Sequence, residues 1–173
     1  GVAIGFDGMT ENGATIGLSA SFSSTDVSGK GTGKAINDID SYTVSVYADK
    51  ATDNGYIEGS LTYGINDNTT SRIVNTAGLN RAYTAAYDSS QLSLKISAGS
   101  PTEVSADTYI TPFGSFTSSS ITTDSYTEKS VTASDNLRLK VDQDDVSSMI
   151  GTIGIKAHKV TDQGTPMISL AIN

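Results

Sequence analysis

The chain has 173 residues, contains no cysteine and carries a formal net charge of −8 at pH 7. This charge, without any basic cluster, excludes nucleic acid as a partner because phosphates would repel the chain. Without cysteine, neither a disulfide framework nor a thiolate metal site can form. Hydrophobic residues make up only 36% of the chain. We therefore expect one domain over residues 1–173 that lacks a thick aliphatic core.

Apolar residues are scattered rather than clustered along the sequence. No run approaches the roughly 18 consecutive apolar residues of a transmembrane helix, and the first residues do not resemble a signal peptide. A membrane β-barrel would show neither signal, since only every second residue of its strands must be apolar. The class of protein therefore has to be inferred from the periodicity of apolar and polar side chains.

Strict alternation of apolar and polar residues is the dominant pattern. It begins in residues 1–8 and is clearest in residues 14–23, where the polar positions hold only small uncharged groups. A period of two indicates β-strands. In chain order, the alternation predicts strands over residues 1–8, 14–23, 42–49, 56–66, 83–99, 109–117, 137–157 and 167–173, the seventh as one extended strand.

The connections between these strands alternate in length. Short turns are predicted at residues 9–13, 50–55, 100–107 and 160–165, and long polar loops at residues 24–40, 67–81 and 118–136. Outer-membrane barrels have short periplasmic turns and long outer loops, whereas a β-sandwich has no reason to alternate in this way. We therefore predict an all-β, antiparallel up-and-down transmembrane β-barrel with about eight strands. Both chain ends would then lie on the long-loop side.

The two sets of alternating residues are assigned to two environments. An apolar face suits lipid, and a face of small polar groups suits a water-filled lumen. The predicted lipid-facing residues are Ile16, Leu18, Phe22, Val44, Val46, Leu61, Leu94, Ile96, Ile153 and Ile155. The predicted lumen-facing residues are Ser19, Ser21, Glu58, Ser60, Lys95 and Lys156. An exposed apolar belt of this kind would make the protein dependent on detergent.

Pro112 lies within the strand predicted over residues 109–117. Proline has no N–H to donate to a neighbouring strand. We therefore expect an edge, a bulge or a strand end at this position.

Several short motifs occur in an order that resembles the β-barrel translocator domain of bacterial autotransporters. The resemblance rests on the order and spacing of these motifs over nearly the whole chain. The motifs are Gly5-Phe6-Asp7, Asn12-Gly13-Ala14-Thr15-Ile16-Gly17-Leu18, Gly55-Tyr56-Ile57-Glu58-Gly59-Ser60-Leu61-Thr62-Tyr63-Gly64, Ile110-Thr111-Pro112-Phe113, Ser125-Tyr126-Thr127-Glu128 and Ile150-Gly151-Thr152-Ile153-Gly154.

This resemblance implies a non-enzymatic, twelve-stranded barrel in the bacterial outer membrane that secretes or anchors an N-terminal passenger at the cell surface. It implies outer-membrane lipid, the passenger and the barrel-assembly machinery as partners, and no cofactor. Matched to the family pattern, the chain resembles strands two to nine. The lumenal helix and first strand of the family would precede Gly1, and its last three strands would follow Asn173.

Other readings of the sequence have weaker support. His158 is the single histidine and could be needed for a Ser-His-acid site; we expect an ordinary interfacial or lumenal residue instead. The stretch at residues 29–34 has the wrong spacing for a phosphate loop. Asp142, Asp144 and Asp145 are weak candidates for a divalent cation site, with a solvated acidic loop as the alternative. The alternative functions are a surface structural or adhesive protein that forms a soluble or fibrillar β-assembly, and a porin-like channel.

Overall fold

The computed structural model describes residues 1–30, 35–76, 78–131 and 137–173. Its strands in chain order are β1 (Val2–Met9), β2 (Ala14–Ser28), β3 (Ala35–Thr52), β4 (Gly55–Thr76), β5 (Leu79–Gly99), β6 (Thr102–Ser105), β7 (Thr108–Thr123), β8 (Tyr126–Thr127), β9 (Lys129–Ser130), β10 (Lys140–Val141), β11 (Val146–Lys159) and β12 (Met167–Ile172). The described residues form no helix that is long and apolar enough to cross a membrane.

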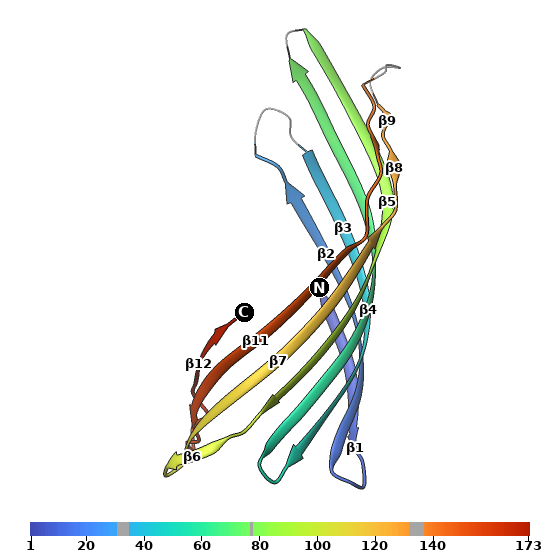
Figure 1. Ribbon diagram of the computed structural model, residues 1–173. Helices are drawn as coiled ribbons and strands as arrows, with labels where there is room; N and C mark the ends of the chain where they lie inside the picture. The colour runs from blue at the N-terminus through green and yellow to red at the C-terminus, as the bar shows by residue number, and fades with distance from the viewer. Residues whose placement is uncertain (31–34, 77, 132–136) are drawn as a thin grey trace.

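Eight long strands form one antiparallel meander in the order β1-β2-β3-β4-β5-β7-β11-β12, which confirms the predicted all-β antiparallel meander and its number of strands. Each strand pairs with the next long strand of the chain, and β1 and β12 are the two edges. The sheet is strongly curved along its length (Figure 1). The short connections lie at one end of the sheet and the longer hairpins rise at the other.

The three predicted long loops are largely wrong, because the strands continue far into them. Residues 24–40 belong mainly to β2 and β3, which pair as far as Ser28 with Ile36; residues 31–34 lie outside the described part. Residues 67–81 form the hairpin of β4 and β5, which pair as far as Thr76 with Leu79; residue 77 is not described. Backbone pairing in a two-stranded extension does not require apolar alternation, so the sequence pattern ended before the strands did.

The turn predicted over residues 100–107 is shorter than expected. β6 continues the line of β5 after a break at Ser100 and Pro101, and it pairs with β7 up to Ser105 and Thr108. The chain reverses at Asp107, which has a φ of 60°.

Pro112 lies opposite the break between β5 and β6. Its carbonyl accepts a hydrogen bond of 3.1 Å from the N–H of Ser100. Because the N–H and C=O of one strand residue point to the same side, the missing N–H of Pro112 also faces the break. The expectation of an edge, a bulge or a strand end at Pro112 itself is therefore wrong, since β7 continues through it and lies between β5 and β11; the break lies in the neighbouring strand instead.

The single extended strand predicted over residues 137–157 is also wrong. β10 ends at Val141, and β11 begins at Val146. β10 pairs with β8 in a separate two-stranded sheet, while β9 pairs with β5 at Tyr83 and Thr84. The predicted loop over residues 118–136 therefore contains the end of β7 and both β8 and β9, with residues 132–136 outside the described part.

The sheet has almost no apolar core of its own. Among described residues, the buried hydrophobic side chains are Tyr83 and Ala85, and both lie in the extension of β5 toward the long-hairpin end. The apolar side chains of a sheet with two accessible faces need a partner or a membrane to cover them.

Candidate functional site: the two faces of the sheet

One face of the sheet, which we call the outer face, carries a continuous apolar belt. Registered residues of neighbouring strands share a face, and Leu18 pairs with Val46, Val46 with Leu61, and Leu61 with Leu94. The same register places all ten predicted lipid-facing residues on this face: Ile16, Leu18, Phe22, Val44, Val46, Leu61, Leu94, Ile96, Ile153 and Ile155.

No layer of the described chain covers the belt. Ile16 is 51% exposed, Leu61 is 48% exposed and Ile153 is 69% exposed. Isolated exposed apolar residues are common in soluble proteins, but a contiguous apolar patch marks an interface with a partner or a membrane.

Charged residues bound the belt at its two ends. At the long-hairpin end, Asp40 pairs with Asp67, and Asp67 with Asp88, so three carboxylates form a row. At the short-turn end, Lys50 lies on the same face of β3, ten positions from Asp40. At about 3.3 Å per residue and a tilt of about 40°, ten residues span about 25 Å along a barrel axis. The apolar band of outer-membrane barrels has about this height.

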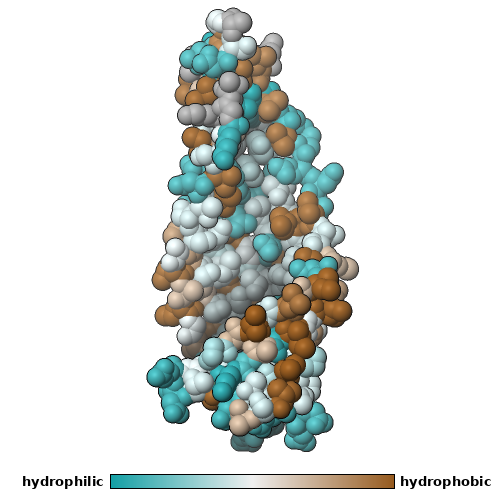
Figure 2. All heavy atoms as spheres, turned by 90° about the vertical axis from the view of Figure 1, so that its left-hand side faces the viewer, coloured by the Kyte–Doolittle hydropathy of each residue, from teal (hydrophilic) through white to brown (hydrophobic). Residues whose placement is uncertain are grey.

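The opposite face, which we call the inner face, is lined by small polar groups. Hydroxyl groups of neighbouring strands hydrogen-bond across it: Ser45 with Thr62 at 2.8 Å and Ser93 with Ser119 at 2.9 Å. The register places all six predicted lumen-facing residues here: Ser19, Ser21, Glu58, Ser60, Lys95 and Lys156. Figure 2 looks onto a hollowed face of the molecule that is pale at its centre, the colour of weakly polar residues, with brown residues along its flanks.

Several aromatic rings of the inner face lie over glycines, among them those of Tyr47 and Tyr56. The ring of Tyr47 lies over Gly17 of the neighbouring strand. Its hydroxyl donates a hydrogen bond of 2.8 Å to Asp7 on β1, two strands away from β3. A Cβ atom at Gly17 would overlap the ring of Tyr47. The ring of Tyr56 covers Gly99 in the same way, at 2.7 Å from the position a Cβ would take. Glycine at these positions therefore provides the space that lets a ring bridge strands.

Contacts between distant strands show that the inner face is concave. Lys156 on β11 donates a hydrogen bond of 3.3 Å to the hydroxyl of Tyr56 on β4, although β5 and β7 lie between them. The ammonium group also lies 4.7 Å from the centre of the Phe113 ring, a cation–π contact. Side chains three strands apart can meet only where the sheet curves toward them.

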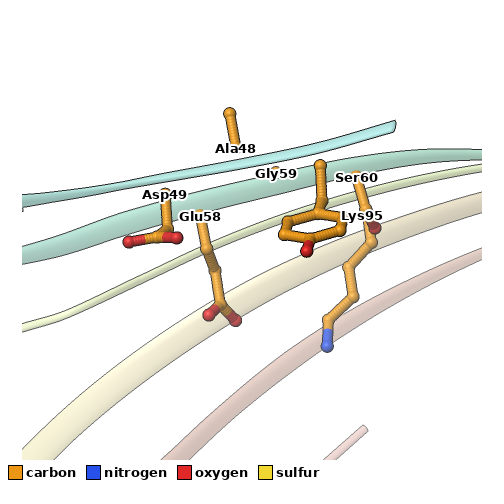
Figure 3. A pocket seen from close by; sticks show the side chains of 7 residues that line it. Ala48, Asp49, Glu58, Gly59, Ser60 and Lys95 are labelled. Atoms are coloured by element: carbon orange, nitrogen blue, oxygen red, sulfur yellow. The ribbon is translucent and has the colours of Figure 1, made fainter. Parts of the chain in front are cut away.

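Charged side chains gather on the inner face toward the short-turn end. A groove of about 260 Å³ is lined by residues that include Tyr47, Asp49, Glu58 and Lys95. Figure 3 shows Asp49, Glu58 and Lys95 on one side of the strands and Ala48 pointing to the other. Glu58 accepts a hydrogen bond from Ser97 of β5. Our prediction of individual lumen-facing residues left out Asp7, Tyr47 and Asp49, although their alternation with apolar neighbours was a usable signal.

A cap segment, defined as residues 124–131 and 137–141, lies beside the extension of β5, with which β9 pairs, beyond the row of aspartates. Its side chains reach onto the inner face. Arg72 of β4 makes two hydrogen bonds of 2.9 and 2.6 Å to the carboxylate of Glu128, and its guanidinium lies 4.6 Å from the centre of the Tyr83 ring. Tyr126 stacks on Tyr87 at 4.4 Å between ring centroids. Glu128 is only 4% exposed.

The electrostatics of the cap follow from this ion pair. The hydrogen bonds from Arg72 lower the pKa of Glu128, helped by the N–H of Leu139 at 2.9 Å, while burial opposes the shift. The same hydrogen bonds raise the pKa of Arg72. The cap was missed from the sequence because its two charges are 56 positions apart.

Among the described residues, the weaker candidates form no group of metal ligands. Asp142, Asp144 and Asp145 lie between β10 and β11, and Asp142 makes an exposed ion pair of 3.5 Å with Lys140. Within the described ranges, no three His, Cys, Asp or Glu residues are grouped as metal ligands. His158 stacks on Tyr109 at 5.0 Å. The stretch at residues 29–34 falls mostly on residues that the structure does not describe.

Comparisons with known proteins found one matching family model and solved structures of similar fold. A family model for the autotransporter beta-domain matches residues 1–173. The fold is similar to the translocator domain of the autotransporter NalP from Neisseria meningitidis, with 17% sequence identity and a TM-score of 0.76 over 98% of this chain and 57% of that one. It is also similar to the beta domain of the Bordetella autotransporter BrkA, with 21% identity and a TM-score of 0.72 over 98% of this chain and 67% of that one. No curated protein matches the chain at significant similarity.

Proposed function

Since this chain belongs to the autotransporter beta-domain family, we propose that it supplies the wall through which a passenger is secreted to, or held at, the cell surface. The domain is a non-enzymatic translocator of type V secretion in the outer membrane. The observation that carries the proposal is the division of one antiparallel meander into an exposed apolar face and a concave face of small polar groups. A translocating wall needs both, because lipid and an aqueous path lie on opposite sides of a single sheet.

The assignment of residues to the two environments is part of the proposal. The ten residues of the apolar belt contact lipid, and Ser19, Ser21, Glu58, Ser60, Lys95 and Lys156 face the lumen. The agreement of the belt's height with that of an apolar membrane band supports this assignment. The exposure of Leu61 and Ile153 supports it as well, since no layer of the described chain covers them.

The partners follow from the family. An autotransporter domain carries its own passenger, and we propose that the passenger's linking segment crosses the lumen along the Ser- and Thr-rich rows. Outer-membrane lipid and the barrel-assembly machinery complete the set that the family resemblance implies. Family membership favours this function over a fibrillar surface assembly or a diffusion porin.

Labelling of single cysteines tests the two environments, because this chain contains no native cysteine. Ser21→Cys and Phe22→Cys are neighbours on opposite faces of β2. In intact outer membranes we expect a water-soluble maleimide to label Ser21→Cys and to label Phe22→Cys much more slowly. Secretion of the passenger to the cell surface provides the activity control for both variants. Equal labelling of the two cysteines, with the passenger still secreted, would contradict the proposed wall.

A further inference from the structure

The outer face contains a groove near its short-turn end. The groove has a volume of about 310 Å³, and its lining includes Ala14, Ala48 and Gly59, from three adjacent strands, with Ile57 and Ile96 beside them. Gly59 pairs with Ala48 on one side and with Ile96 on the other. These small residues leave a trough in a surface that elsewhere carries larger apolar side chains.

Lys50 lies at the short-turn end of the same groove. It lines the groove and pairs with Ala14 and Ile57, one row beyond Ala48 and Gly59. In the described part of the chain, no carboxylate forms a salt bridge with its ammonium group. Asp49 and Glu58 also line the groove, but their side chains point to the other side of the sheet from Ala48 (Figure 3).

The charges of the outer face are polarised along β2 to β5. The charged residue at the short-turn end of this face is Lys50, and those at the long-hairpin end are Asp26, Asp38, Asp40, Asp67 and Asp88. An anionic group is therefore attracted to one end of the belt and repelled from the other. Lys50 also stands at the boundary of the apolar band, where lipid phosphates lie and where a lysine can extend its ammonium group toward them.

We propose that this groove is a binding site for one anionic glycerophospholipid of the leaflet on the short-turn side. An acyl chain fills the trough over Ala48 and Gly59, and the lipid phosphate accepts charge-assisted hydrogen bonds from Lys50. The site is continuous with the lipid-facing belt, so the inference rests on the proposed function for the orientation of the outer face. It adds a specific lipid class and a fixed position to an otherwise general lipid contact.

The charge contact is tested with Lys50→Gln and a matched control. Lys159→Gln removes the other outer-face lysine at the short-turn end, on β11, away from the groove. The intact protein, purified in a neutral detergent, is titrated with phosphatidylglycerol, and bound lipid is counted by native mass spectrometry. We expect Lys50→Gln to weaken phosphatidylglycerol binding about fivefold and Lys159→Gln to leave it unchanged. Equal effects of the two variants would overturn the inference.

The acyl-chain contact is tested with a variant that fills the trough. A Cβ at Gly59 would meet a single backbone oxygen at 3.7 Å, so Gly59→Leu can be built without a clash at Cβ. Gly151→Leu is the control, since it lies on the outer face of β11 with no atom within 4 Å of its Cβ. We expect Gly59→Leu to lose the single bound lipid and Gly151→Leu to keep it. Retention of the lipid by a folded Gly59→Leu protein would refute the site.

The outcomes separate this site from the proposed function. If the protein stays monodisperse without detergent, the lipid-facing wall itself is wrong. If the protein requires detergent but Lys50→Gln behaves like Lys159→Gln, only the lipid site is wrong. Passenger secretion in each variant shows that the barrel has assembled.

Discussion

Arg72 and Glu128 form a bidentate ion pair, 2.9 and 2.6 Å between donor and acceptor atoms, that ties the cap segment to the hairpin of β4 and β5. Arg72 also donates a hydrogen bond of 3.1 Å to the carbonyl of Leu137, and Glu128 accepts one from the N–H of Leu139. One pair of side chains thus holds both described parts of the cap. The most deeply buried group of the described chain, the Tyr83 side chain, lies against this pair.

Removing the carboxylate should release the cap without unfolding the sheet. Glu128→Gln leaves Arg72 without its charged partner, and we expect a local loss of about 2 kcal/mol, since hydrogen bonds to charged groups contribute about 1.5–3 kcal/mol. Hydrogen exchange of residues 124–131 and 137–141 measures the effect. Lys140→Gln is the control, because its ion pair with Asp142 is exposed and contributes little. Unchanged exchange in Glu128→Gln would show that the pair does not hold the cap.

The same pair predicts the pH dependence of the cap. The pKa of Glu128 is lower in the folded protein than its ordinary value of about 4.3. Its contribution is therefore fully present above about pH 4.3 and is lost as the pH falls through the lowered folded pKa. We expect the protease resistance of the cap to be constant from pH 8 to 5 and to fall below pH 4. Glu128→Gln should lack this acid-dependent step.

The two faces of β2 should respond differently to the same charge. Leu18→Arg places a guanidinium on the outer face near the middle of the belt, and we expect a loss of about 2–4 kcal/mol in a bilayer. Ser19→Arg places it on the inner face, where water can solvate it, and should cost much less. Reversible unfolding of the intact protein in lipid vesicles gives both values. Similar losses would mean that hydrocarbon does not cover the outer face.

The contact of Tyr47 with Gly17 predicts that a side chain added at Gly17 destabilises the protein. Gly17→Ala would force the ring of Tyr47 off the inner face and break its hydrogen bond to Asp7. We expect a loss of about 1–3 kcal/mol, the usual cost of overpacking. Gly151→Ala, which meets no neighbouring atom, is the control.

A second substitution separates this steric effect from strand propensity. In the Tyr47→Ala background the ring is absent, so Gly17→Ala should cost little further stability. A full additional loss in the double variant would show that the ring is not the cause.

The sequence alone determined the part of the fold that carries the apolar belt. The period of two in β2, β3 and β4 is visible in residues such as Ile16, Leu18 and Leu61, because each must match its environment on one face independently of its neighbours. The antiparallel order, the strand number and the two faces therefore followed from local pattern. Only the tertiary structure decided where the strands end and what lies beyond the belt. The extensions of β2 to β5 are held by backbone pairing, the cap depends on Arg72 meeting Glu128, and Lys50 acquires its neighbours only through the register of three strands.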